Sequence, residues 1–251
     1  MPKHFSVWIV ILLLALAACN SDDDDETADG EVDPAALLEN AAQQLDDANA
    51  FELVLEVSGA PVFLDAETIG LDTPIQFRRA EGYVARPDAL QANVTVLIED
   101  SAVEIEVIAI DEDQYLFHPA LTFGQWQAII FSEDFNPTSL LTGDQSIADA
   151  LRSAQEVAYM GEADLDGLTV HHLRGQVEAS QVKAVTVGLI GTETGSVQID
   201  VFIRQDNGRL EQLVLEEPIN PDADPERPAM WSIGVYDYGA DVTITRPEVE
   251  E

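Results

Sequence analysis

Apolar residues recur at every second position through most of this 251-residue chain. The segment 51–57 reads FELVLEV, with apolar residues at all of its odd positions. Because successive side chains of a strand point to opposite faces, this period of two predicts a strand with one buried face. Further strands of this kind are predicted at 75–85, 90–99, 102–110, 113–118, 168–177, 197–204, 209–216, 230–236 and 241–245. Short turns such as Asp206-Asn207-Gly208 separate neighbouring strands, so we expect hairpins in a meandering antiparallel sheet.

A few regions of the sequence have helical spacing instead. Asp33 and Pro34 are typical of a helix start, as N-cap and first helical residue, and apolar residues recur at three- and four-residue intervals through 34–50. Two further short helices are predicted within 136–154, after an Asn-Pro pair and after a serine N-cap. The segment 178–188 fits a helix or a strand.

No linker rich in Pro, Gly or Ser divides the predicted strands, so residues 34–251 are expected to form a single domain. A sheet of about ten strands with an apolar face needs cover, and two or three short helices do not fill a strongly curved one. The predicted fold class is therefore α+β, with a curved antiparallel sheet, or half-barrel, that is covered by a few helices and encloses a hydrophobic cavity. The alternative is a fully packed core.

The chain opens with a short basic start and an apolar run too short to span a bilayer comfortably, which is typical of a signal peptide over 1–18. The run ends in LAAC at Cys19, which matches the bacterial lipobox, whose cysteine sulfur receives a diacylglyceryl group with acyl chains such as palmitate. Cys19 is the only cysteine, so it cannot form an internal disulfide. We expect lipidation of Cys19, an acidic tether over 19–33 and a lipid-anchored location on the extracytoplasmic face of the cell membrane. A short transmembrane anchor with an incidental cysteine is the alternative.

Asp and Glu outnumber Lys and Arg by 48 to 11, which gives a formal net charge of −37. Such a surface repels phosphates, so nucleic acid is excluded as a partner. It also repels anionic headgroups, so membrane contact has to come from an anchor or an apolar mouth. The charge fits adaptation to salt, cation binding or simply a solvated acidic surface. The run 22–25 (DDDD) lacks the spaced ligands and the glycine of a calcium loop, so no metal site is predicted.

The sequence offers few groups for catalysis. After the leader, His118, His171 and His172 are the only histidines, and the last two would face opposite sides of a strand. No motif for a nucleophile, a nucleotide or a metalloprotease centre is present, so no catalytic residue and no cofactor are predicted. A hydrolase of the cell envelope is the least favoured interpretation. The following aromatic residues could line a ligand site or belong to the core: Tyr83, Tyr115, Phe117, Trp126 and Phe131.

The order of several short motifs resembles the LppX/LprG (LprAFG) lipoproteins of actinobacteria and their relatives, over nearly the whole mature domain. After the lipobox and an Ala/Leu-rich helix come a strand from Phe51, EGYVARPDALQANV (81–94), FNPTSLL (135–141), LDGLTV (165–170) and a closing strand pair, VYDYGADVTI (235–244). The resemblance implies a LolA- or LolB-like fold around a hydrophobic cavity. It also implies binding of triacylglycerol- or glycolipid-like lipids with long acyl chains, their transport within the cell envelope and a membrane transporter as partner, with no catalytic residue.

We therefore expect a membrane-anchored lipoprotein that binds lipid chains in its cavity and carries them within the cell envelope. The expected site is the inward face of the strands. The candidates, chosen by alternation, are Leu53, Leu55, Val57, Val94, Val96, Ile105, Val107, Ile199 and Val201. The alternative function is that of a structural or assembly lipoprotein that binds protein partners and has a filled core.

Overall fold

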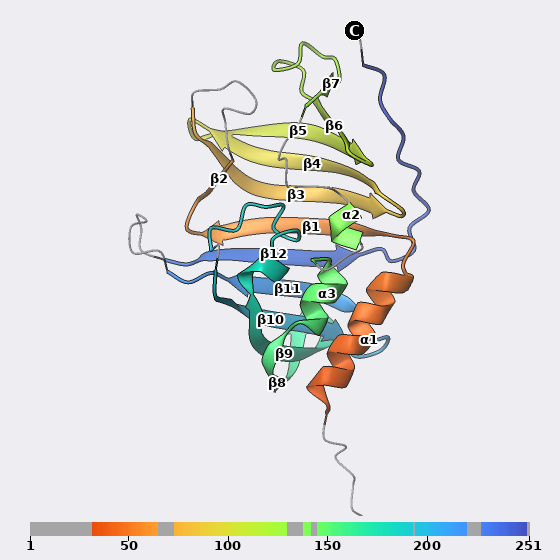
Figure 1. Cartoon of the computed structure of the whole chain (residues 1–251), viewed down its shortest axis with the longest axis vertical. Helices are drawn as coiled ribbons and strands as arrows, with labels where there is room; N and C mark the ends of the chain where they lie inside the picture. The colour runs from red at the N-terminus through yellow and green to blue at the C-terminus, as the bar shows by residue number, and fades with distance from the viewer. Residues whose placement is uncertain are drawn as a thin grey trace, which may run out of the picture. The chain divides into compact units, whose positions relative to one another are not determined.

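The alternating segments form one antiparallel sheet of 12 strands (Figure 1). The computed structural model describes residues 32–64, 73–129, 138–141, 145–192, 194–219 and 227–249. The strands are β1 (Ala50–Gly59), β2 (Val62–Leu64), β3 (Ile75–Ala85), β4 (Ala89–Ile98), β5 (Ser101–Ile110), β6 (Asp113–Phe117), β7 (Gln127–Ala128), β8 (Gln155–Leu165), β9 (Leu168–Glu178), β10 (Ser196–Arg204), β11 (Leu210–Glu216) and β12 (Ala229–Tyr236). The helices are α1 (Pro34–Asp47), α2 (Thr138–Leu141), α3 (Ile147–Arg152) and a 3-10 turn, η2 (Ala179–Gln181).

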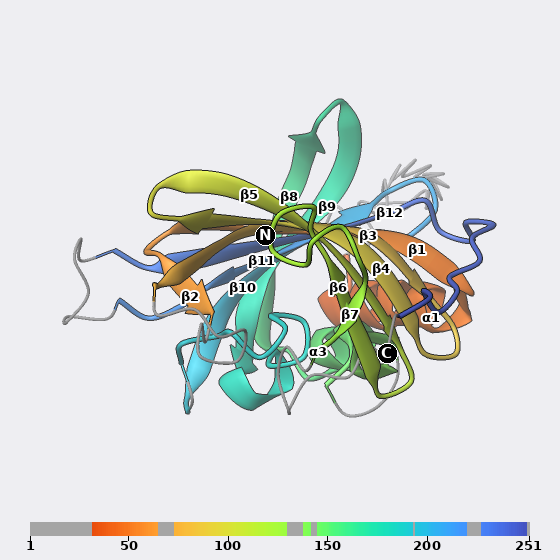
Figure 2. The same cartoon turned by 90° about the horizontal axis from the view of Figure 1, so that it is seen from above.

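The first and the last strand of the chain lie side by side in the middle of the sheet. The strand order is β7-β6-β5-β4-β3-β1-β12-β11-β10-β9-β8, with β2 beside β3. Between β1 and β12, Leu53 faces Val235 and Leu55 faces Ile233, so the apolar inner rows continue from one half of the sheet to the other. The outermost strands, β7 and β8, do not pair with each other, so the sheet is a curved, open layer (Figure 2).

Helix α1 begins where the sequence predicts. The Oδ1 atom of Asp33 accepts hydrogen bonds from the backbone amides of Ala35 at 2.9 Å and Ala36 at 3.4 Å, which satisfies two of the unpaired donors at the helix start. The buried face of α1 includes Leu38 and Leu45, at the predicted spacing. This face packs on α3 and on β8 and β11, and Figure 2 shows α1 and α3 on the same side of the sheet.

A large part of the buried core lies in the half of the sheet that these helices cover. Trp231 of β12 is the largest fully buried side chain, and Leu213 of β11 and Ile203 of β10 are buried with it. Removing such side chains from water supplies the main stabilising free energy, at about 25 cal/mol per Å² of apolar surface. The cavity lies in the other half, β3 to β7, where the described residues provide only the four-residue helix α2, through Leu140, as helical cover.

The predicted fold class, a curved antiparallel sheet with a few covering helices, is confirmed, and the first nine predicted strands are present with ends shifted by at most two residues. Strand β8 was not predicted, because its small residues, such as Ala158 and Gly161, weaken the alternation. The predicted strand at 241–245 is wrong: this segment is not a strand, since both edges of β12 are already paired and cannot accept a hairpin partner. In the segment 178–188, Glu178 ends β9 and η2 is followed by turns, so neither an α-helix nor a further strand forms there.

The predicted signal peptide (1–18), the lipidated Cys19, the run 22–25 and most of the tether (19–33) lie outside the described residues. Residues from Val32 to Glu251 cluster as one unit. Within the described part of the chain, no helix combines the length and the apolar character that a membrane crossing requires.

Candidate functional site

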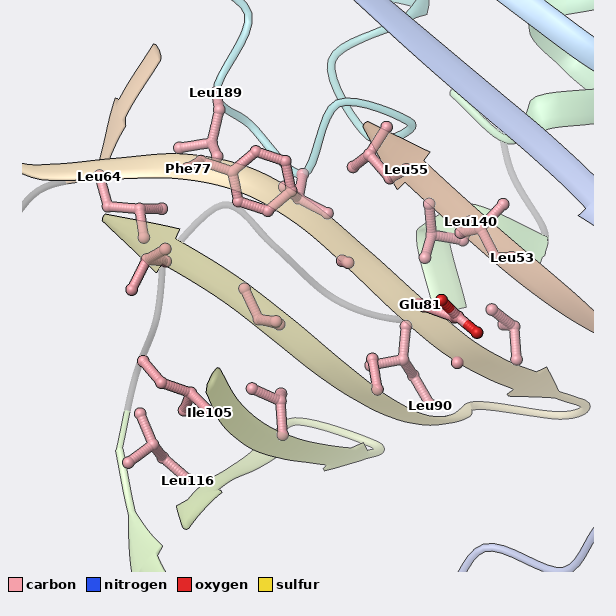
Figure 3. Close-up of a pocket in the computed structure, with 18 of the residues that line it drawn as sticks. Leu53, Leu55, Leu64, Phe77, Glu81, Leu90, Ile105, Leu116, Leu140 and Leu189 are labelled. Atoms are coloured by element: carbon pink, nitrogen blue, oxygen red, sulfur yellow. The ribbon is translucent and has the colours of Figure 1, made fainter. Parts of the chain in front are cut away.

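An apolar cavity lies against the inner face of strands β1 and β3 to β6 (Figure 3). It encloses about 150 Å³, and it opens outward, so that about 1160 Å³ is free of protein atoms when the open space is included. Almost every residue around it is apolar. The lining residues are Leu53, Leu55, Leu64, Ile75, Phe77, Ala80, Glu81, Gly82, Val84, Leu90, Ala92, Val94, Val96, Ile105, Val107, Leu116, Leu140, Val187 and Leu189.

The hollow arises from small residues in the middle of cross-strand rows. In one row Leu53 faces Gly82, which faces Ala92, and Val107 and Leu116 continue it on β5 and β6. Large side chains at the ends and small ones in the centre leave the centre empty, because a row of side chains fills an interior only where their volumes match the space.

The neighbouring row also has a small residue next to a large one at its end. Leu55 faces Ala80, and Val94 and Ile105 follow on β4 and β5. The register of β3 also shifts between Phe77 and Arg79, which is typical of a β-bulge. Bulges bend a strand and increase its twist, so this irregularity contributes to the curvature of the cavity wall.

The turn segment 182–192 covers one side of the cavity with Val187 and Leu189. Val187 has a φ of +48° and Gly188 has a φ of +78°, so the chain reverses direction here. A positive φ is unusual for a β-branched residue, which marks Val187 as a strained position whose side chain lines the cavity. The segment is held by Thr186, whose Oγ1 donates to the carbonyl oxygen of Val182 at 3.0 Å.

The lining of the cavity is uncharged except for one residue. Its one charged lining residue, Glu81, follows Ala80 and precedes Gly82, so its side chain belongs to the opposite face of β3. There Glu81 accepts hydrogen bonds from the guanidinium group of Arg79. Among the described lining residues, nothing therefore offers an unpaired charge to a polar ligand. The cavity suits an apolar ligand such as an alkyl chain.

Six of the nine residues predicted to form the site line this cavity: Leu53, Leu55, Val94, Val96, Ile105 and Val107. Val57, Ile199 and Val201 do not line it and are packed in the core. Val57 and Ile199 belong to the cross-strand row that contains Trp231 and Leu215, whose bulk leaves no space beside them.

The sequence interpretation missed a larger set of lining residues. Those on predicted strands could have been found by the same alternation: Ile75, Phe77, Val84, Leu90 and Leu116. Leu64, Leu140, Val187 and Leu189 lie on short or irregular elements that carry no periodic signal. Of the aromatic candidates, Tyr83, Tyr115, Phe117 and Trp126 do not line the cavity, and Phe131 lies outside the described residues.

The histidines form separate polar contacts. His171 Nδ1 lies 3.2 Å from the hydroxyl of Tyr159, and His172 Nε2 lies 2.5 Å from Oδ1 of Asp200. His118 is in the turn region after β6. None of the three lines the cavity, and the described residues contain no group of three or more potential metal ligands.

Solved structures with the same fold include two mycobacterial lipoproteins. LprF from Mycobacterium bovis superposes with a TM-score of 0.64 at 17% identity and covers 85% of this chain and 96% of that chain. The lipoprotein LppX from Mycobacterium tuberculosis superposes with a TM-score of 0.56 at 13% identity and covers 84% and 98%, respectively. At these identities the matches show the fold alone.

A LolA superfamily protein from Nitrosomonas europaea is also matched, at 13% identity over 86% of this chain and 98% of that chain, but its TM-score of 0.27 is too low to indicate a shared fold. No curated protein sequence matches significantly. The model of the LppX_LprAFG lipoprotein family matches residues 33–244, which is most of the chain. The protein therefore belongs to the LppX_LprAFG lipoprotein family, a family of lipoproteins and not of enzymes.

Proposed function

We propose that this lipoprotein binds the acyl chains of lipids in its cavity and carries them within the cell envelope. The observation that carries the proposal is the cavity itself, an open hollow with apolar walls that α2 contacts only through Leu140 in the described part of the chain. Each methylene removed from water contributes about 0.8 kcal/mol, so a long acyl chain binds there without polar recognition. The ligand class is a lipid with long chains, such as a triacylglycerol or a glycolipid.

The size of the hollow limits how such a ligand is seated. An enclosed cavity of about 150 Å³ is of the size that accommodates benzene. A long chain therefore fills the enclosed part with one segment and continues through the opening, with its polar group outside. This arrangement agrees with the absence of an unpaired charge on the described lining residues.

Membership of a lipoprotein family supports the proposed anchor at Cys19, with a signal peptide over 1–18, a tether over 19–33 and one lipid-binding domain over 34–251. The location that follows is the extracytoplasmic face of the cell membrane. A carrier that is held at one membrane needs a donor or an acceptor for its cargo, and a membrane transporter is the proposed partner.

The experiment compares two Val→Phe variants of the mature chain without its anchor, with the leader removed and Cys19→Ala. Val94 lines the cavity, and Val94→Phe places an aromatic ring in the hollow between Ala80 and Ile105. Val214 faces the other side of the sheet, because its neighbours Leu213 and Leu215 are buried, so Val214→Phe is the matched control. Native mass spectrometry and uptake of a fluorescent fatty acid report the bound ligand.

We expect copurifying lipid and fatty-acid uptake in the wild type and in Val214→Phe, and a loss of at least about tenfold in uptake affinity in Val94→Phe. Uptake that is absent from the wild type, with no copurifying lipid, would instead favour the structural or assembly lipoprotein. Hydrolysis of a lipid ester by the wild type would favour an envelope enzyme.

A further inference from the structure

A long stretch of this acidic chain carries no charge. None of the residues 114–132 is Asp, Glu, Lys or Arg, although charged residues make up 24% of the sequence. The stretch contains the loop 118–126, which connects β6 to β7 and which we call the apolar loop. Phe123, at its tip, is 86% exposed, and Leu121 is 39% exposed. Two large apolar side chains thus face solvent in the longest uncharged run of the described residues, on a chain that is otherwise acidic.

The apolar loop is held in shape by its own hydrogen bonds. His118 Nδ1 accepts from the backbone amides of Ala120 at 3.1 Å and Leu121 at 3.0 Å. The Oγ1 atom of Thr122 accepts from the amide of His118 at 3.1 Å, and it donates to the carbonyl oxygen of His118 at 2.9 Å. The amides of Thr122 and Gln125 donate to the carbonyl oxygens of His118 and Thr122. The loop is therefore preorganised, and Phe123 holds its exposed position at a φ of +54°.

These internal hydrogen bonds lower the cost of moving the loop from water into an apolar environment. A backbone amide without a partner is costly in an apolar medium, so a segment that enters the edge of a bilayer has to satisfy its amides internally. The apolar loop does so for the amides at positions 118, 120, 121, 122 and 125. Trp126, at the base of the loop and in contact with Phe117 at 5.5 Å between ring centroids, is of the residue type enriched at membrane interfaces.

We propose that the apolar loop is a membrane-contact site that inserts Phe123 and Leu121 into the interfacial region of a lipid bilayer. The occupant is a lipid surface because an uncharged tip, carried on a loop whose base is internally hydrogen-bonded, can bury apolar area there without desolvating a charge. The site goes beyond the proposed lipid binding in the cavity and does not depend on it. β6 connects the two, since Leu116 lines the cavity and the loop begins two residues later.

The position of the loop adds a geometric consequence. It joins β7, one edge of the sheet, whereas α1 packs near β8, the other edge (Figure 1). Ten strand spacings separate β7 from β8, which at about 4.8 Å each is on the order of 50 Å along the curved sheet. The contact site therefore lies at the edge of the sheet remote from the helix that follows the predicted tether.

The test is partition of the mature chain without its acyl anchor into phosphatidylcholine vesicles, measured by flotation and by quenching of tryptophan fluorescence with brominated lipids. After removal of the leader, Trp126 and Trp231 are the only tryptophans, and Trp231 is fully buried, so quenching reports Trp126. The variant is Leu121→Ser with Phe123→Ser. The matched control is Met160→Ser, which removes a 49% exposed side chain from β8 at the other edge.

We expect the double variant to lose at least about tenfold in partition and to lose the quenching, while the Met160→Ser control keeps both. Partition of the wild type into anionic vesicles should be weaker and should rise with salt, because screening reduces repulsion from the acidic surface. Fatty-acid uptake should be unchanged in the double variant, so a failure of this proposal is distinguishable from a failure of the proposed lipid binding.

Three results would overturn the proposal. The first is equal partition of the double variant and the wild type. The second is binding that weakens as salt is raised, since that indicates attraction between charges. The third is a loop-dependent dimer in sedimentation without vesicle binding, which would identify a second copy of the chain as the occupant.

Discussion

The indole Nε1 of Trp231 donates a hydrogen bond of 2.8 Å to Oε1 of Glu217, whose side chain is only 5% exposed. The second carboxylate oxygen of Glu217 accepts from the backbone amide of Thr192 at 2.9 Å and from its hydroxyl at 3.0 Å. Thr192 ends the segment 182–192 that covers the cavity, and Trp231 stacks on Phe77 of the cavity wall at 6.0 Å between centroids. The buried carboxylate of Glu217 thus links the segment 182–192, which covers the cavity, to Trp231, which packs on the cavity wall.

The first prediction follows from these hydrogen bonds of Glu217. Glu217→Ala leaves the indole N–H of Trp231 buried without a partner, so the free energy of unfolding should fall by about 1–3 kcal/mol. The segment 182–192 should also lose protection from amide hydrogen exchange, and a bound fluorescent fatty acid should dissociate faster. Glu216→Ala is the control, because Glu216 makes one long contact of 3.4 Å with Gln198 and faces the other side of the sheet. Equal exchange rates for 182–192 in the two variants would contradict the role of Glu217.

A second prediction separates cavity wall from packed core with two identical substitutions. Ile199→Ala opens a hole in a filled row and should destabilise the protein by about 2–5 kcal/mol. Ile105 already borders empty space and has fewer atoms around it, so Ile105→Ala should cost less, toward the lower end of this range. Chemical denaturation measures both. Uptake of a fatty acid should change only in Ile105→Ala, and an equal change in both variants would argue against the assigned cavity.

Much of the fold was predictable because strand alternation is a local property. The pattern in 51–57 identifies β1 and its inward side without knowledge of any neighbour. The start of α1 was also readable, since Asp33 and Pro34 act within one turn of the chain. The predicted strand at 241–245 failed for a non-local reason: β12 had no free edge left for it.

The cavity could be predicted only in part. Alternation identifies which side chains point inward, but it does not show whether the space before them is filled. That depends on the sizes of side chains along a cross-strand row, and the row is defined by register. Leu53 meets Gly82 and then Ala92, which leaves a hollow, whereas Val57 meets Trp231, which fills the interior. Small residues at inward positions of predicted strands are the signal that was available in the sequence.

A third prediction concerns Glu52 on the outer face of β1. Partial burial, followed by the nearby carboxylates of Glu81 and Asp237, raises the pKa of Glu52 above its ordinary value, although Arg79 opposes the shift. With a higher pKa in the folded than in the unfolded state, the ionised carboxylate disfavours folding at neutral pH, and this cost disappears as the pH falls through the folded-state pKa. Glu52→Gln should therefore be more stable than the wild type at pH 7, by roughly 0–1 kcal/mol, as is typical for surface charges.

The measurement is the free energy of unfolding of both proteins across pH 4 to 7. The advantage of Glu52→Gln should shrink at the acidic end, where the wild-type carboxyl group is protonated. In the background of Asp237→Asn the advantage should be smaller, because one cause of the shift has been removed. Parallel pH profiles for the wild type and Glu52→Gln would show that the carboxylate has no such effect.

The last prediction concerns how a chain with a net charge of −37 holds two helices together. Arg152 of α3 contacts two carboxylates of α1, with Nε 3.2 Å from Glu39 Oε2 and Nη2 2.8 Å from Asp46 Oδ2. Arg152→Gln removes the only positive charge in this contact, so the two carboxylates then lie against an uncharged partner. The cost should be about 1 kcal/mol or less at low ionic strength, because the groups are partly exposed, and it should decline as salt shortens the Debye length to about 8 Å near 0.15 M.

Thermal melting at several NaCl concentrations measures this dependence. A double-mutant cycle with Glu39→Gln and Asp46→Asn supplies the control, since Arg152→Gln should cost little once both acids are neutral. If the cost of Arg152→Gln were the same at all salt concentrations and in the neutralised background, Arg152 would be acting through the packing of its methylene groups and not through its charge.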